Sequence, residues 1–293
     1  MTPTSRASEA KVAVITRTRD RPLLLARAAE SIYGQSFRDF HWVIVNDGGA
    51  GAPAAAAAET ARAKGVAVTV INHEYSRGIE AASNAAIARA SSEFIVIHDD
   101  DDRWEPTFLA TTVAALDRHP DHAGVVTAAV RVVERIDGET VTELERAPFN
   151  DWAHGIYLVD MAQRNLFPPI AFLFRRSFYQ EVGGFDETLP VLGDWDFNLK
   201  VLARADIGFL PEPLACYHIR TFDGVPNGTN ANMVTGDISR VQEYDRVIRN
   251  RLLRADFARG AIGLGWLVNL GRQHHAMWES LRRLATITAS REP

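Results

Sequence analysis

The feature that most limits the fold is an alternation of short β-branched segments with amphipathic segments between residues 11 and 98. The strands expected from this pattern span residues 11–17, 40–47, 66–71 and 93–98. Helical spacing of apolar residues places helices between them, at residues 21–33, in an alanine-rich segment that ends at residue 64, and at 78–90. Strands that alternate with helices in this way predict an α/β fold with a doubly wound, mostly parallel sheet.

The alternation is less regular beyond residue 121. Strands are expected in this region, at residues 123–135, 168–175, 206–210 and 214–219. A helix with acidic residues in its first turn is expected at 193–205, and a loop rich in glycine, proline and asparagine at 222–230. The chain after residue 236 is expected to be helical.

Composition narrows the class of protein. The formal charge of -5 and the lack of a long basic run argue against a partner nucleic acid. The single cysteine, Cys216, excludes an internal disulfide and a cysteine-cluster zinc site. Residues 1–10 are polar, so no secretory signal is expected, and no stretch approaches the roughly 18 apolar residues of a membrane span. We expect a cytoplasmic protein, with the inner face of the membrane as the alternative location.

Polar residues follow several of the expected strands directly. Thr18 ends the first strand, Asp47 ends the second, and the acidic run Asp99–Asp102 follows the fourth. In an open α/β sheet, ligands bind beyond the carboxyl ends of the strands. These residues are therefore expected to converge on one ligand site although they are far apart in the sequence.

The acidic run raises an electrostatic problem, because adjacent carboxylates repel one another and resist leaving water. A divalent cation would neutralise them, and hard oxygen ligands suit magnesium or manganese, which usually bring substrate phosphates. The alternative is a helix start, where acidic residues are favoured by the helix dipole. Asp102, just before the segment RWEP, fits that alternative.

Other candidate residues allow two interpretations each. Asp47 is either a turn residue, since it precedes glycine, or a partner for a base or ribose. Asp194, like Asp196, is either a helix-start acid or a general base. His218 is either a structural histidine or a ligand. Arg77 either holds a phosphate or forms a surface ion pair with Glu80.

Four ordered segments, which together cover roughly residues 11–220, resemble the family 2 glycosyltransferases, whose fold is the GT-A type with a Rossmann-like sheet. The segments are VAVITRTRDRP, SIYGQSFRDFHWVIVNDGG, SRGIEAASNAAIARASSEFIVIHDDDDRWEP and GGFDETLPVLGDWDFNLKVLARADIGFLPEPLACYH. The resemblance implies an inverting, metal-dependent glycosyltransferase. Such an enzyme moves a sugar from a UDP-, GDP- or dTDP-linked donor to a hydroxyl acceptor, with Mn2+ or Mg2+ as cofactor.

The resemblance also implies roles for individual residues. Residues that match the nucleotide-sugar side of the family's site are Thr18, Arg19, Asp47, Arg77, Asp99 and Asp100. Asp101, the second acid of the Asp-x-Asp motif, would bind the metal, and His218 lies where some relatives place a histidine near it. Asp194 falls on the family's Glu-Asp motif at its catalytic aspartate.

The chain departs from the family pattern at several positions. Asn46 and Gly49 replace the first aspartate and the serine of the Asp-Asp-Gly-Ser turn, and Arg19 replaces a common aromatic residue. Gly193 replaces the usual glutamate before Asp194. A catalytically degenerate nucleotide-sugar-binding or scaffolding module is therefore kept as an alternative. A nucleotidyltransferase is disfavoured, because the segment TRTRDRP lacks the glycine-rich loop such enzymes carry.

We expect three parts in the chain: a polar tail at 1–10, a GT-A domain at 11–225 and a helical region at 226–293. Within the domain, 11–104 would form the nucleotide-sugar half and 105–225 the acceptor half. The helical region carries apolar and basic side chains, among them Trp266, Trp278 and Arg272. We consider three roles for this region: packing on the domain, formation of a homodimer, or contact with an anionic membrane. The expected acceptor is a glycan or lipid-linked glycan, as in bacterial polysaccharide assembly.

Overall fold

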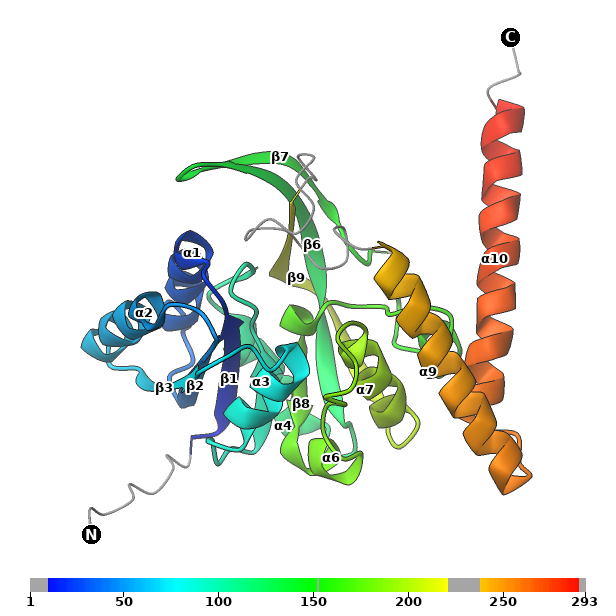
Figure 1. The fold of residues 1–293 in the computed structure, drawn as a ribbon, viewed down its shortest axis with the longest axis horizontal. Helices are drawn as coiled ribbons and strands as arrows, with labels where there is room; N and C mark the ends of the chain where they lie inside the picture. The colour runs from blue at the N-terminus through cyan, green and yellow to red at the C-terminus, as the bar shows by residue number, and fades with distance from the viewer. Residues whose placement is uncertain (1–9, 152, 221–237, 290–293) are drawn as a thin grey trace.

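The computed structural model describes residues 10–151, 153–220 and 238–289 of the chain. At its centre lies a curled nine-stranded sheet with flanking helices (Figure 1). The strand order is β3-β2-β1-β4-β8-β6-β9-β5, and β7 pairs with β6 outside this path. The α/β fold expected from the sequence is confirmed, together with the helices that follow the domain.

The N-terminal half is a doubly wound unit, and its parallel strands are β1, β2, β3 and β4. Its elements in chain order are β1 (Val12–Thr18), α1 (Pro22–Tyr33), β2 (Phe40–Asp47), α2 (Gly51–Ala63), β3 (Ala67–His73), α3 (Ile79–Ile87) and β4 (Phe94–Ile97). β2 and β4 are buried along their whole length, which explains their nearly continuous apolar sequences. Pro22 suits the first position of α1, where no backbone N–H is needed.

The second half of the domain is mixed in strand direction. Its elements are β5 (Arg103–Trp104), α4 (Phe108–Arg118), β6 (Gly124–Asp137), β7 (Thr140–Pro148), α5 (Leu158–Met161), η1 (Pro169–Ala171), β8 (Phe172–Arg175), α6 (Arg176–Glu181), α7 (Gly193–Leu202) and β9 (Ile207–Arg220). β8 runs antiparallel to both β4 and β6, and so joins the two halves into one sheet. The loop expected at 222–230 lies outside the described residues.

β9 corrects one expectation from the sequence. Residues 206–210 and 214–219 were expected to form two strands, but 207–220 form one strand that pairs with β6 in parallel. The segment between the two expected strands contains Pro211 and Pro213, and the pairing passes through it with register shifts beside Ala128. β7 was not expected at all, because this strand is mostly exposed and has no apolar alternation. Edge strands and bulges tolerate such residues.

The C-terminal helices are α9 (Ile238–Arg259) and α10 (Leu264–Ala289). Arg249 of α9 is buried and donates to the carbonyl oxygens of Ala162 and Gln163, at 3.0 and 2.9 Å. Its guanidinium also lies 4.7 Å from the Trp195 ring centroid. α9 is therefore packed on the domain through specific contacts with residues of, or next to, α5 and α7.

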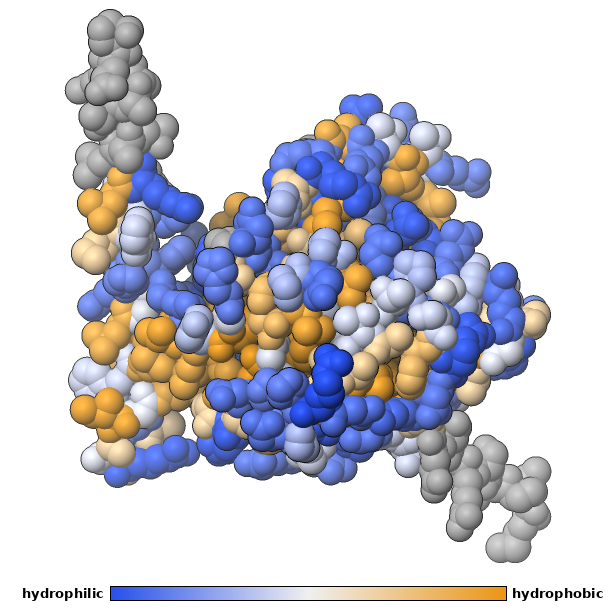
Figure 2. All heavy atoms as spheres, turned by 180° about the vertical axis from the view of Figure 1, so that it is seen from behind, coloured by the Kyte–Doolittle hydropathy of each residue, from blue (hydrophilic) through white to orange (hydrophobic). Residues whose placement is uncertain are grey.

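Helix α10 exposes several large apolar side chains. Among the side chains that the structure describes, these are Trp266, Leu270, Met277, Trp278 and Leu281. In Figure 2 orange side chains are scattered along this protruding helix and gather on the adjoining face of the domain. None of the described helices combines the length and apolar character that a membrane crossing requires.

Candidate active site

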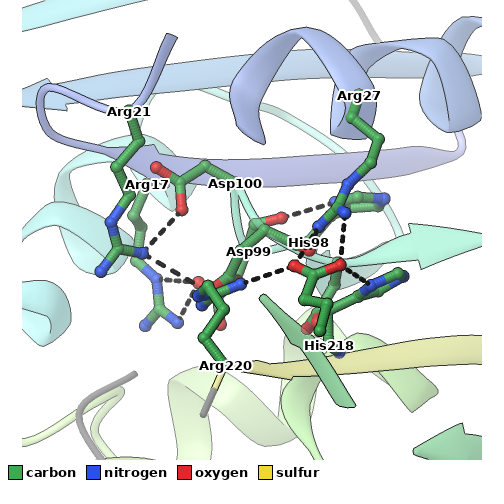
Figure 3. Close-up of polar contacts among 11 residues, drawn as sticks. Arg17, Arg21, Arg27, His98, Asp99, Asp100, His218 and Arg220 are labelled. Atoms are coloured by element: carbon green, nitrogen blue, oxygen red, sulfur yellow. Dashed lines mark hydrogen bonds and ion pairs between the residues drawn. The ribbon is translucent and has the colours of Figure 1, made fainter. Parts of the chain in front are cut away.

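The carboxyl ends of β1, β4, β6 and β9 meet around one cluster of charged side chains (Figure 3). Register explains the meeting: Ile15 of β1 lies beside Ile97, so the acidic run begins two residues further along, next to Arg17. In the other half of the sheet, Glu134 and Arg220 are direct partners at the ends of β6 and β9. The acidic run thus contacts side chains of β1 and β9. The expectation that Thr18, Asp47 and the acidic run form one ligand site stays a prediction.

The first two aspartates of the acidic run are paired with arginines from the first strand and the turn after it. Arg17 Nε donates to Asp99 Oδ1 at 2.8 Å, and Arg21 Nη1 donates to Asp100 Oδ1 at 3.1 Å. Burial raises the pKa of Asp100 to about 6, and the attraction of Arg21 opposes that rise. Asp100 therefore holds its proton more tightly than an ordinary aspartate.

The last two aspartates face β9. Asp101 forms an ion pair with Arg220, and Asp102 Oδ1 accepts the backbone N–H of His218 at 2.8 Å. Burial acts to raise the pKa of Asp101, but Arg220 and Arg21 outweigh it and hold that pKa below its usual value. Burial and the charge of Asp101 raise the pKa of Asp102 well above its usual value. Arginines thus pair with Asp99, Asp100 and Asp101, and burial raises the pKa values of Asp100 and Asp102.

Glu134 is a centre of this cluster that sequence reasoning missed. Arg27 Nη1 and Nη2 donate to its two carboxylate oxygens at 2.6 and 3.0 Å, and Arg220 Nη1 donates to Oε1 at 3.2 Å. His218 Nδ1 lies 2.9 Å from Oε2. Burial opposes ionisation of Glu134, yet the hydrogen bonds from His218 and Arg27 lower its pKa to about 2. Glu134 is therefore a carboxylate at every pH at which proteins usually work.

The same cluster can be tested for its fit to a divalent ion. The Glu134 carboxylate on His218 Nδ1 is the kind of partner that orients metal-binding imidazoles. Asp101 supplies a hard oxygen ligand, although Arg220 holds it in this arrangement. Among the described residues, a ready-made group of at least three such ligands is found only at His119, Asp121 and His122. Mg2+ and similar ions often bind through one or two carboxylates plus substrate phosphates, so Asp101 and His218 fit that less complete kind of site.

Asp47 organises the loop that follows β3. Its carboxylate accepts hydrogen bonds from His73 Nδ1 and Ser76 Oγ, both at 2.7 Å, and from the backbone N–H groups of Arg77 and Gly78 at 2.9 and 3.1 Å. Burial opposes the ionised form, but these bonds lower the pKa of Asp47. The Asp47 carboxylate therefore ties the end of β2 to the loop that contains Arg77, and neither of its two sequence interpretations is tested by these contacts.

The remaining nucleotide-side candidates lie at the rim of the cluster. Thr18 is buried and hydrogen-bonded to Asp100, whereas Arg19 and Arg77 are exposed. No ion pair joins Arg77 to Glu80 among the described residues, because Glu80 turns inward and is only 3% exposed. The surface ion pair considered from the sequence is therefore wrong.

On the acceptor side, the structure separates Asp194 from Asp196. Asp196 is buried, and its oxygens lie 2.6 Å from Lys200 Nζ and 2.7 Å from Arg251 Nη2, so it ties α7 to α9. Asp194 Oδ2 instead accepts one bond from the neutral amide of Asn165, at 2.7 Å. Burial raises the pKa of Asp194, although hydrogen bonding and the charge of Arg17 oppose that rise. Of the two acids, Asp194 is the one suited to accept a proton.

Arg17 connects the two sides of the site. The charges of Asp99, Glu80 and Asp194 raise the pKa of its guanidinium against the effect of burial. Donor-side and acceptor-side carboxyl groups therefore lie within electrostatic reach of a single cation. Sequence reasoning missed the arginine partners of the acidic run, which are Arg17, Arg21 and Arg220. Only their positions at strand ends or helix starts could have indicated them.

Solved structures with this fold include a fragment of TarS from S. aureus in complex with UDP-GlcNAc, at 19% identity and a TM-score of 0.60. That match covers 83% of the present chain and 66% of the TarS fragment. A mannosyltransferase from Pyrobaculum calidifontis, in complex with GDP-Man and Mn2+, matches at 18% identity and a TM-score of 0.57. It covers 96% of the present chain and 84% of that structure, and both likenesses establish the GT-A fold.

Sequence comparison identifies the family. An uncharacterized glycosyltransferase of Bacillus subtilis, YwdF, is 28% identical over 65% of the chain and 67% of its own length. A pre-mycofactocin glycosyltransferase of Mycobacterium tuberculosis is 25% identical over 75% of the chain, which spans only 45% of that relative. The model of glycosyl transferase family 2 matches residues 12–183, more than half of the 293 residues. The chain therefore belongs to glycosyl transferase family 2, and it is a transferase.

Proposed function

We propose that the protein transfers a sugar from a nucleoside diphosphate sugar to a hydroxyl group of an acceptor, with inversion at the anomeric carbon. The observation that carries the proposal is the charge cluster itself. Asp99, which follows β4, pairs with Arg17 of β1, and Arg17 also lies within electrostatic reach of Asp194 on α7. Family membership supports the reaction class, and the UDP-GlcNAc and GDP-Man complexes of the structural neighbours support a nucleotide-sugar donor.

In this proposal the nucleotide lies on the N-terminal half of the sheet. Thr18, Asp47 and Asp99 would shape the region for base and ribose, with Asp100 behind them. The exposed guanidinium groups of Arg19 and Arg77 would attract the diphosphate. The nucleotide of the donor is not assigned among UDP, GDP and dTDP, because Arg19 replaces the aromatic residue that is common at this position.

Asp101 and His218 would hold the divalent ion, Mn2+ or Mg2+. When bound, the ion would offset the negative charge that develops on the departing nucleoside diphosphate. Binding at Asp101 would compete with Arg220, which pairs with that carboxylate in the structure. The Mn2+ in the mannosyltransferase structure supports this part of the proposal.

Asp194 would act as the general base. The acceptor hydroxyl gives its proton to the Asp194 carboxylate while its oxygen forms a bond to the anomeric carbon. The bond from that carbon to the diphosphate oxygen breaks, and both its electrons leave with the nucleoside diphosphate. Attack from the face opposite the leaving group inverts the anomeric centre. The raised pKa of Asp194, which burial causes, favours its acceptance of the proton.

We infer that the acceptor is a glycan or a lipid-linked glycan, and that the product enters a bacterial polysaccharide. The division at 11–104, 105–225 and 226–293 remains part of this proposal. The packing of α9 supports a structural role for the C-terminal region. The exposed apolar residues of α10 keep homodimer formation and peripheral membrane contact as further proposals.

A second candidate, a binding module without turnover, is favoured by Gly193, which lacks the carboxylate of the family motif. Purified protein incubated with UDP-, GDP- and dTDP-sugars and Mn2+ separates the two candidates. The proposal predicts nucleotide release by the wild type and its loss in Asp101→Ala. Binding of a donor, seen as a raised melting temperature, without any release would favour the module.

A further inference from the structure

Glu80 is the most unusual acidic residue outside the donor side of the site. It is the second residue of α3 and only 3% exposed. Its Oε2 atom is buried and has no hydrogen-bond partner among the described residues. Buried carboxyl oxygens are normally paired, because an unsatisfied polar group is costly. The position of Glu80 therefore needs an explanation beyond helix formation.

The carboxyl group of Glu80 lies against Gly193, the first residue of α7. A Cβ atom added to Gly193 would lie 2.2 Å from Glu80 Oε1 and 2.4 Å from its carboxyl carbon. These separations are far below contact distance, so any side chain at 193 would overlap Glu80 as it now stands. Residue 193 is also the position at which the family motif carries a glutamate. The chain thus lacks a carboxyl group at position 193 and places one beside that position from α3.

The charged groups around Glu80 come from several elements. Burial raises the pKa of Glu80 to about 8; Arg17 of β1 opposes this rise, while Asp194, Asp99 and Asp196 add to it. Tyr179 of α6 also lies within electrostatic reach. Glu80 consequently keeps its proton at neutral pH. Where two neighbouring carboxyl groups have unequal surroundings, one can hold a proton while the other stays ionised.

We propose that Glu80 is a positioning residue for Asp194. Its protonated carboxyl group, supplied by α3, replaces the missing side chain of Gly193 and fixes the first turn of α7. Asp194 is thereby left as the ionised base. This inference rests on the proposed function, because it assigns Glu80 a role through Asp194. It also explains why Gly193 need not mark a degenerate site.

A double-mutant cycle tests whether the carboxyl group of Glu80 takes the place of one at position 193. The variants are Glu80→Ala, Gly193→Glu and the two combined, assayed by nucleotide release from UDP-GlcNAc and GDP-mannose with Mn2+. Glu80→Ala is expected to lower kcat roughly tenfold, and Gly193→Glu alone at least as much because of the overlap. The double variant is expected to return to within a few-fold of wild type. A double variant no more active than the worse single variant would overturn the inference.

The Glu80→Gln variant tests the role of the proton through the pH dependence of activity, which a change in packing alone would not alter. Glutamine mimics the protonated carboxyl group, so kcat at pH 7 should stay close to wild type. Wild-type activity should fall above about pH 8 as Glu80 ionises beside Asp194, and the variant should lose this decline. An unchanged alkaline decline in the variant, or a large loss of kcat at pH 7, would contradict the role.

A measurement without substrate separates this inference from the proposed function. The pKa of Glu80 in the folded protein exceeds its usual value of 4.5, so its stabilising protonation is complete below that pH and is lost as pH rises through about 8. The melting temperature of wild type relative to Glu80→Gln should therefore fall between pH 5 and pH 9. A constant difference would overturn the inference alone. A falling difference in a protein that turns over neither donor would reject the proposed function, and with it the role of Glu80 in catalysis.

Discussion

The donor and acceptor sides of the site use acidic residues in opposite ways. On the donor side, Asp99, Asp101 and Glu134 each pair with at least one arginine. On the acceptor side, Asp194 has a neutral amide partner, and one oxygen of Glu80 has no partner among the described residues. Burial opposes ionisation of Asp101 and Glu134, but their cationic partners hold both pKa values below the usual range, whereas burial raises the pKa values of Asp194 and Glu80.

The difference fits two tasks. A polyanionic donor needs a rigid region in which cations are already in place, and buried ion pairs with several hydrogen bonds provide one. A general base needs an affinity for a proton, and burial raises the pKa of Asp194 although the charge of Arg17 opposes the rise. Substitution of Glu134 on the donor side should therefore mainly lower stability, and substitution of Asp194 on the acceptor side should mainly lower turnover.

The largest effect is expected for Asp194→Asn. The amide cannot accept the acceptor proton, so kcat should fall by about 10^2- to 10^4-fold, the usual contribution of a general base. Donor affinity, measured by calorimetry, should stay unchanged. Asp196→Asn is the matched control: it weakens contacts with Lys200 and Arg251 and should lower the melting temperature while folded enzyme stays active. Equal losses of kcat in both variants would refute the assignment of the base.

Glu134→Gln should have the largest effect on stability. The substitution leaves Arg27 and Arg220 with a neutral partner in a buried position, and breaking a buried pair typically costs about 3 kcal/mol or more. Urea denaturation of wild type and variant measures the loss. A change of less than about 1 kcal/mol would show that the arginines do not depend on this carboxylate.

The same carboxylate should contribute to the acid sensitivity of the fold. The pKa of Glu134 is lowered to about 2 in the folded protein, so its stabilisation is present above its usual value of 4.5 and is lost as pH falls toward 2. The stability difference between wild type and Glu134→Gln should shrink as pH falls from 6 to 3. A stability difference between the two proteins that grows as pH falls from 6 to 3 would contradict this prediction.

The smallest effect is expected for Glu143→Gln on β7. Its ion pair with Arg146 spans 2.9 Å, but both side chains are nearly half exposed. Exposed pairs contribute about 0.5 kcal/mol or less, so urea denaturation should hardly detect the change. A loss as large as that of Glu134→Gln would remove the distinction between buried and exposed pairs.

The sequence predicts the parallel half of the molecule well. Continuous apolar strands that end in polar residues indicate the parallel sheet, and the polar ends, such as Thr18 and Asp47, lie at the carboxyl ends of its strands. The pattern is clear because buried parallel strands allow few other sequences. In this half, local sequence and tertiary structure agree.

The mixed half is harder to predict, for physical reasons. Glu134 and Arg220 meet through the pairing of two strands far apart in the sequence, and a charged residue within a strand gives no sign of its partner. Two strands were expected where 207–220 form one, because register shifts opposite Ala128 carry the pairing past Pro211 and Pro213. Glu80 looked like a surface residue because nothing in α3 alone shows that its first turn faces Gly193. Each case depends on long-range contacts.

The most direct test of the account is an anomalous difference map from crystals grown with a bound donor and Mn2+. We predict a manganese peak next to the Asp101 carboxylate and the donor diphosphate, with His218 beside it and Arg220 moved off Asp101. A donor lodged elsewhere, or one bound here with no manganese peak and Arg220 still paired with Asp101, would contradict the account.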